Sequence, residues 1–115
     1  MAKTVSTSVK LPAKLDKELC LQVIKDGYGM RGKNKWVNDA IEEFLKLPAY
    51  IDYTDIASDM TELSKAIGLR ISKELIGKVD KAVIEIRKVN FEIEAIQSHI
   101  IRAAIMQKII RSPNK

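Results

Sequence analysis

The sequence predicts a mainly helical protein with one two-stranded antiparallel β-ribbon, built from two related units that share a core. Residues 8–15 (SVKLPAKL) and 68–75 (GLRISKEL) both alternate apolar and polar residues and then change to a helical period, 60 positions apart. Residues 34–41 match 98–105 at a separation of 64. Repetition of a strand–helix–helix unit at a near-constant spacing indicates a duplicated architecture.

Charge divides the chain into a first unit (1–47), an acidic linker (48–64) and a second unit (65–115). Each unit is close to the size, about 40 residues, below which an isolated core fails, so we expect one shared core. Residues 1–46 carry nine bases and six acids, 47–64 four acids and no base, and 65–115 eleven bases and five acids. Two basic units around an acidic segment favour an anionic partner, with nucleic acid the first choice.

The first unit begins with an alternating segment over residues 4–11, which predicts a strand. Its two faces are Val5, Thr7, Val9 and Leu11 on one side and Ser6, Ser8 and Lys10 on the other. Pro12 ends this strand and suits the first turn of a helix. The apolar stripe expected on that helix is Leu15, Leu19, Val23 and Ile24. Cys20, beside the stripe, is interpreted as a small buried hydrophobe.

A glycine-rich turn, residues 27–33 (GYGMRGK), separates the two helices of the first unit. Its glycines stop the helix and permit positive φ; the segment lacks the Gly-Lys-Ser/Thr ending of a phosphate-binding loop. Asn34 is expected to cap the second helix. Trp36 falls at helical spacing with Val37 and Ala40, so it is interpreted as a core residue.

In the linker, Thr54 is expected to cap a short helix over residues 55–63 that packs along the outside of the core. Its inward residues would be Ile56, Met60 and Leu63. The second unit repeats the first. Ile67, Leu69 and Ile71 alternate with Ala66, Gly68 and Arg70; Ser72 caps the next helix, Ser98 caps the last one, and Ile100, Ile101, Ala104, Ile105, Ile109 and Ile110 face the core. The change of spacing from 60 to 64 predicts four extra residues in the first helix of this unit or in the joint after it.

The strand, helix, turn and helix of each unit resemble the ribbon-helix-helix superfamily, which includes the strand-based DNA readers Arc and MetJ. The matching residues are 8–12 (SVKLP), Asn34 leading into 37–45 (VNDAIEEFL), 68–72 (GLRIS), and Ser98 leading into 101–105 (IRAAI). Two units on one chain, with 45–50 (LKLPAY) after the first, look like the TraY branch of the family, whose members act at transfer origins and transfer-gene promoters of conjugative plasmids. The resemblance implies a transcriptional regulator, a relaxosome accessory factor, or both.

The resemblance also implies which residues meet double-stranded DNA. A two-stranded ribbon fits the major groove, and its outer face would supply the base contacts: Ser6, Ser8, Lys10, Ala66, Gly68 and Arg70. Helix N-termini and nearby cations would hold phosphates: Lys3, Arg31, Lys33, Asn34, Lys35, Ser98 and His99. Because the two strands differ, the preferred site need not be palindromic. Further copies bound alongside, relaxase or RNA polymerase are the other partners that this reading allows.

Other classes of protein are less consistent with the sequence. A second hypothesis is a protein-interaction module of the antitoxin type, and a third is an all-helical adaptor in which residues 65–72 form no strand. We expect no enzyme and no cofactor, because no Ser/His/Asp set, paired carboxylates or metal-ligand cluster is present, and His99 is the only histidine. A single cysteine favours a reducing, cytoplasmic setting, and no apolar run reaches the roughly 18 residues of a membrane span.

Overall fold

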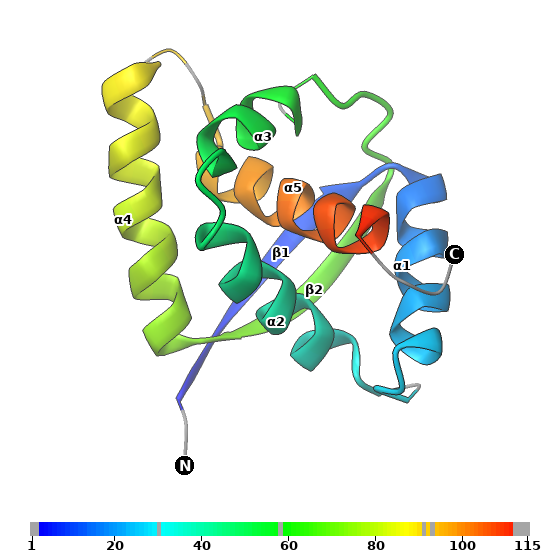
Figure 1. Cartoon of the computed structure of the whole chain (residues 1–115). Coiled ribbons are helices and arrows are strands. Elements are labelled where there is room, and N and C mark those ends of the chain that lie inside the picture. The colour runs from blue at the N-terminus through cyan, green and yellow to red at the C-terminus, as the bar shows by residue number, and fades with distance from the viewer. Residues whose placement is uncertain (1–2, 30, 58, 91, 93, 112–115) are drawn as a thin grey trace.

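The protein is mainly helical and contains one two-stranded antiparallel sheet, as the sequence predicted (Figure 1). A computed structural model describes residues 3–29, 31–57, 59–90, 92 and 94–111. Its elements are, in order, β1 (Thr4–Leu11), α1 (Ala13–Lys25), α2 (Lys33–Leu45), α3 (Tyr50–Ala57), β2 (Lys65–Ser72), α4 (Lys73–Val89) and α5 (Ile96–Ile110).

The sheet is formed by the first strand of each unit, because β1 pairs antiparallel with β2. Ser8 lies opposite Gly68, and Val9 lies opposite Ile67. The expected alternation therefore holds, and the buried residues of the inner face are Val9, Leu11, Ile67, Leu69 and Ile71. Of the other two residues predicted for this face, Thr7 is half-buried and Val5 is 36% exposed. The beginning of β1 projects past the helices in Figure 1.

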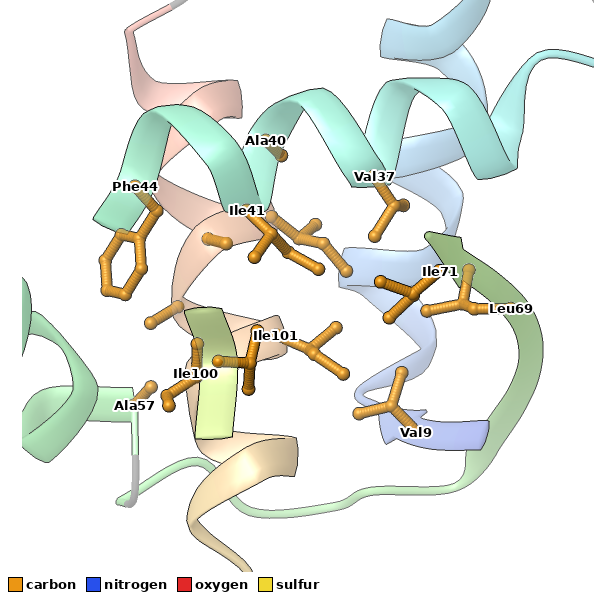
Figure 2. Packing of buried hydrophobic residues seen from close by; sticks show 14 of the residues in the cluster. Val9, Val37, Ala40, Ile41, Phe44, Ala57, Leu69, Ile71, Ile100 and Ile101 are labelled. Carbon is orange, nitrogen blue, oxygen red and sulfur yellow. The ribbon is translucent and has the colours of Figure 1, made fainter. Parts of the chain in front are cut away.

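The described helices cover the inner face of the sheet and leave its outer face exposed (Figure 1). Helices α2 and α5 cross over its inner face, with α1 and α4 at opposite flanks. Figure 2 shows how side chains from both crossing helices meet those of the strands, with Ile41 and Ile101 at the centre. Both of these isoleucines are fully buried, as is Trp36, which was expected in the core. One continuous core therefore serves both halves of the chain.

The two strand-to-helix corners have the same backbone conformation. Pro12 and Ser72 both have φ −58° and ψ 142°. The Ser72 hydroxyl accepts a hydrogen bond from the Leu75 amide (3.1 Å), which confirms the predicted cap. Helix α4 has 17 residues and α1 has 13, so the four extra residues of the second unit lie in its first helix.

The predicted starts of the second helices are wrong. Helix α2 begins after Gly32, and α5 begins after Ala95, so neither Asn34 nor Ser98 is an N-cap. At Gly32 a Cβ atom would lie 2.3 Å from the Tyr28 carbonyl oxygen, which ends the turn at a position where only glycine fits. The turn itself has positive φ at Gly27 and Gly29, as expected; Met30 lies outside the described residues.

The linker helix occurs earlier than predicted. Thr54 lies inside α3, where its hydroxyl donates to the Tyr50 carbonyl oxygen (2.8 Å) instead of capping. Ile56 is 59% exposed, whereas Ala57 is buried. The Phe44 and Tyr50 rings meet edge to face, with centroids 6.2 Å apart, which anchors the helix directly after α2. The expectation that this segment packs along the core is confirmed, while Ser58 lies outside the described residues.

Three predicted burials are also wrong. Cys20 is exposed, Ile24 is 55% exposed and Ile110 is 49% exposed. The buried face of α1 is instead Leu19, Gln22 and Val23. Cys20 and Ile24 follow at about 100° and 140° around the helix from Leu19, both on the same side of that face and outside it. Ile110 is the last residue of α5, beyond the helices that cover the rest of that face.

Candidate nucleic-acid interface

The outer face of the sheet carries the six residues predicted to contact bases. All six are exposed, and the register brings them together as three cross-strand pairs. These pairs are Ser6 with Arg70, Ser8 with Gly68, and Lys10 with Ala66. Since the helices lie on the inner side (Figure 1), this face of the described protein is open to a partner.

The shape of this face follows from its residue types. The central pair, Ser8 and Gly68, is small, and a Cβ atom on Gly68 would meet nothing within 4 Å. Arg70 on β2 lies opposite Ser6, four residues before Lys10 on β1. The two cationic residues are therefore about 13 Å apart along the ribbon, at ~3.3 Å per residue. The result is a low centre between two long cationic side chains, close to the ~12 Å width of a DNA major groove.

The outer edge of β2 is held by side chains of α2. Asn38 Nδ2 donates to the Arg70 carbonyl oxygen (2.9 Å), and Asn38 Oδ1 accepts from the Ser72 amide (3.0 Å). Asn34 Oδ1 accepts from the Arg70 amide (3.1 Å). Asn34 is thus a strand clamp and not a helix cap. These three bonds satisfy edge groups that a two-stranded ribbon would otherwise leave to solvent.

The outer edge of β1 is held by Arg102 of α5. Arg102 Nη1 donates to the Lys10 carbonyl oxygen (3.1 Å), and Nη2 lies 2.6 Å from His99 Nδ1. Arg102 is only 3% exposed, and burial lowers its pKa. No contact role for Arg102 was predicted from the sequence. The available signal was a lone cation inside the apolar run 100–105 (IIRAAI).

The predicted phosphate-binding cations gather around the N-terminus of α2. Lys33 pairs with Asp16 (3.8 Å), and Lys35 pairs with Asp39 (3.3 Å). Arg31 is exposed beside them. Both ion pairs are at least partly exposed, so each contributes little to stability and a phosphate can compete for the lysines. Lys3 lies elsewhere, at the end of the ribbon, where its carbonyl oxygen accepts from the Lys73 amide (2.9 Å).

The helix-end amides differ from those expected. The Trp36 amide donates to the Gly32 carbonyl oxygen (2.9 Å), and the His99 amide donates to the Ala95 carbonyl oxygen (3.2 Å). Because the helices begin earlier than predicted, their unpaired first-turn amides come from earlier residues. Ser98, half-buried, lies within the first turn of α5.

His99 cannot supply the charge that the sequence suggested. Burial first, and then the charge of Arg102, lowers its pKa below the usual 6.5. Its imidazole is therefore neutral at pH 7, and Nδ1 faces the Arg102 guanidinium. His99 therefore offers a phosphate no ionic contact.

Comparison with known proteins identifies no relative: no family model, curated protein or solved structure matches the chain. The described part of the chain brings no three His, Cys, Asp or Glu side chains together as a possible metal site. Among the described helices, none combines the length and apolar composition needed to cross a membrane. The exposed ribbon face is consequently the feature from which a function can be argued.

Proposed function

We propose that the protein binds double-stranded DNA sequence-specifically by placing the outer face of β1 and β2 in the major groove. The observation that carries this proposal is the ribbon itself: a strand pair with helices on one side only, a small centre and a cation at each end. A two-stranded sheet alone is only marginally stable in water. The helices packed on its inner face would therefore stabilise it while its outer face stays exposed.

Base reading would come from the six side chains of that face. Lys10 and Arg70 can donate to guanine O6 and N7, and a good bidentate contact discriminates by about 1–3 kcal/mol. Ser6 and Ser8 can serve several bases. Ala66 and Gly68 can touch a thymine methyl or allow close approach of the backbone. So few contacts define a short subsite, and useful specificity would require further copies bound alongside or DNA shape readout.

Phosphate contacts would fix the register of the ribbon in the groove. The N-terminus of α2, with Lys33, Asn34 and Lys35, offers first-turn amides and charge together. Arg31 would add to that end and Lys3 to the end of the ribbon. At the N-terminus of α5, Ser98 and His99 would contribute hydrogen bonds.

We further propose that the chain is a tandem ribbon-helix-helix protein, with 1–47 and 65–115 acting as the two halves of a dimer fused through 48–64. The order strand, helix, helix occurs twice, and the strands of the two halves pair with each other, which supports this assignment. A fused dimer need not be symmetric, so its site would be asymmetric as well.

The biological role proposed here depends on the resemblance stated above. It is regulation of transcription, accessory binding at a transfer origin of a conjugative element, or both, in the cytoplasm, with relaxase or RNA polymerase as protein partners. The exposed thiol of Cys20 is compatible with a reducing compartment.

The decisive experiment is selection of bound duplexes from a random pool, followed by sequencing. We expect a short, asymmetric motif. Lys10→Ala and Arg70→Ala should each abolish discrimination at different base pairs of that motif, whereas Lys35→Ala should weaken all duplexes alike and reduce the salt dependence. Enrichment of no motif, or a motif unchanged by Lys10→Ala and Ser8→Ala together, would contradict the proposal.

A further inference from the structure

Each strand of the ribbon is held at its outer edge by the second helix of the other half of the chain. Asn38 of α2 bonds to the Arg70 carbonyl on β2, and Arg102 of α5 bonds to the Lys10 carbonyl on β1. Lys10 and Arg70 are 60 positions apart, and Asn38 and Arg102 are 64 apart, the two spacings of the repeat. The same contact is therefore made twice, with different chemistry.

That difference matches the strand end that each side chain holds. Asn38 offers a donor and an acceptor, and it uses them on the Arg70 carbonyl and the Ser72 amide. The residue that corresponds to Ser72 on β1 is Pro12, which has no N–H. Arg102 has donors only, so it loses nothing by facing a strand end that can accept but not donate there.

The surroundings of Arg102 are not those of a residue that stabilises the folded state. It is 3% exposed, its Nε atom has no hydrogen-bond partner, and no ion pair with a carboxylate is found for it among the described residues. Burying a guanidinium without a counter-ion destabilises the folded state relative to an apolar side chain of similar size. The atom that it holds is the carbonyl of Lys10, whose side chain stands on the exposed face.

We propose that Arg102 and Asn38 are positioning residues for DNA reading, Arg102 for the half read by Lys10 and Asn38 for the half read by Arg70. Each sets the backbone position from which its strand presents a cation to the groove, and Arg102 does so from the interior, without touching DNA. This inference rests on the proposed function. It predicts that a buried side chain controls specificity at one part of the site only.

The test compares wild type, Arg102→Met and Asn38→Ala on the selected duplex and on single-base-pair variants of it. Lys10→Ala and Arg70→Ala first identify which base pairs belong to which half. Arg102→Met should reduce discrimination about tenfold at the Lys10 base pairs, the range of one base contact, and leave the Arg70 base pairs unchanged. Asn38→Ala should do the reverse. Arg102→Met should melt at or above the wild-type temperature, and Arg102→Lys, which keeps a donor, should restore part of the discrimination.

An equal loss at both halves, or no loss, would overturn the inference, because it would make Arg102 merely structural or irrelevant. Arg102→Lys provides the same comparison if Arg102→Met does not fold. If the wild-type protein selects no duplex, the proposed function fails. The hydrogen bond from Arg102 to the Lys10 carbonyl oxygen can then be tested without DNA, by NMR. The carbonyl ¹³C resonance of Lys10 should then move in the Arg102 variants while that of Arg70 stays in place; an unmoved Lys10 resonance would refute the clamp itself.

Discussion

Lys10 and Arg70 lie on opposite strands and at opposite ends of the exposed ribbon face, with the Ser8–Gly68 pair between them. The arrangement keeps two like charges apart and leaves the middle of the face without a protruding side chain. A duplex can approach such a surface until its base edges meet the backbone of Gly68. Binding in this way would depend on small side chains at the centre of the ribbon more than on the charges at its ends.

Gly68→Val should therefore separate folding from DNA binding. A Cβ atom at Gly68 would meet nothing within 4 Å, and valine favours strands over glycine, so the melting temperature should stay the same or rise. On the outer face, however, the branched side chain would hold the ribbon away from the base edges. We expect affinity for the selected duplex to fall by at least about tenfold, the loss of one base contact.

The matched control is Ser8→Val, at the position directly opposite Gly68. It places the same valine side chain on the other strand at the same level of the ribbon. Equal losses from the two variants indicate a steric requirement for a low centre. If Gly68→Val bound the selected duplex as wild type does, with Ser8→Val alone impaired, DNA would be touching β1 only and the major-groove placement of both strands would be wrong.

Gly77→Ala tests whether α4 can be stabilised without affecting the ribbon. Gly77 is exposed within α4, and a Cβ atom there would meet nothing within 4 Å. Replacing a helical glycine by alanine stabilises by about 0.5–1 kcal/mol. We expect that gain in denaturant unfolding, together with unchanged binding of the selected duplex. A loss of binding would show that α4 itself contacts DNA.

Much of the ribbon could be predicted from the sequence, because alternation and the repeat spacing both identify the strands. The helix starts could not. Asn34 has the chemistry of an N-cap, yet its side chain accepts from the Arg70 amide, 36 positions away, and a tertiary bond of this kind leaves no local signal. Ala95, directly before α5, has a left-handed conformation (φ 52°), which few non-glycine residues adopt.

The side-chain hydrogen bonds to the outer strand edges could not be predicted from the sequence for a related reason. Arginine is normally exposed, so Arg102 would be assigned to the surface on propensity, whereas its acceptor is a carbonyl 92 positions earlier. The ion pairs of Lys33 with Asp16 and of Lys35 with Asp39 likewise depend on how α1 and α2 sit. The outer-face residues themselves follow from period-two alternation alone.

Tyr28 should ionise unusually late. Its hydroxyl donates to Asp39 Oδ2 (2.6 Å), and this bond first, then burial, raises the pKa of Tyr28 to about 12. The unfolded chain ionises near 10, so the stabilisation is fully present below pH 10 and is lost as the pH rises from 10 through 12. Tyrosinate absorbance during an alkaline titration should show one such late group.

Asp39→Asn is the control for that titration, because it removes the charge and keeps the shape. The late transition should move back toward pH 10, and the loss of stability above pH 10 should become shallower. A titration curve that Asp39→Asn leaves unchanged would show that the late group is another tyrosine; Tyr50, whose pKa burial raises, is the one to examine next by substitution with Phe.

Acid should weaken the fold through His99. Its folded pKa lies below the usual 6.5 because of burial and the nearby Arg102 charge, so protons bind the unfolded chain more readily. The free energy of unfolding is therefore unaffected above pH 6.5 and decreases as the pH falls from 6.5 through the folded pKa. Since His99 is the sole histidine, its ring resonances report that pKa directly. His99→Gln should remove this part of the acid loss, and a wild-type ring that titrates at or above pH 6.5 would disprove the buried contact with Arg102.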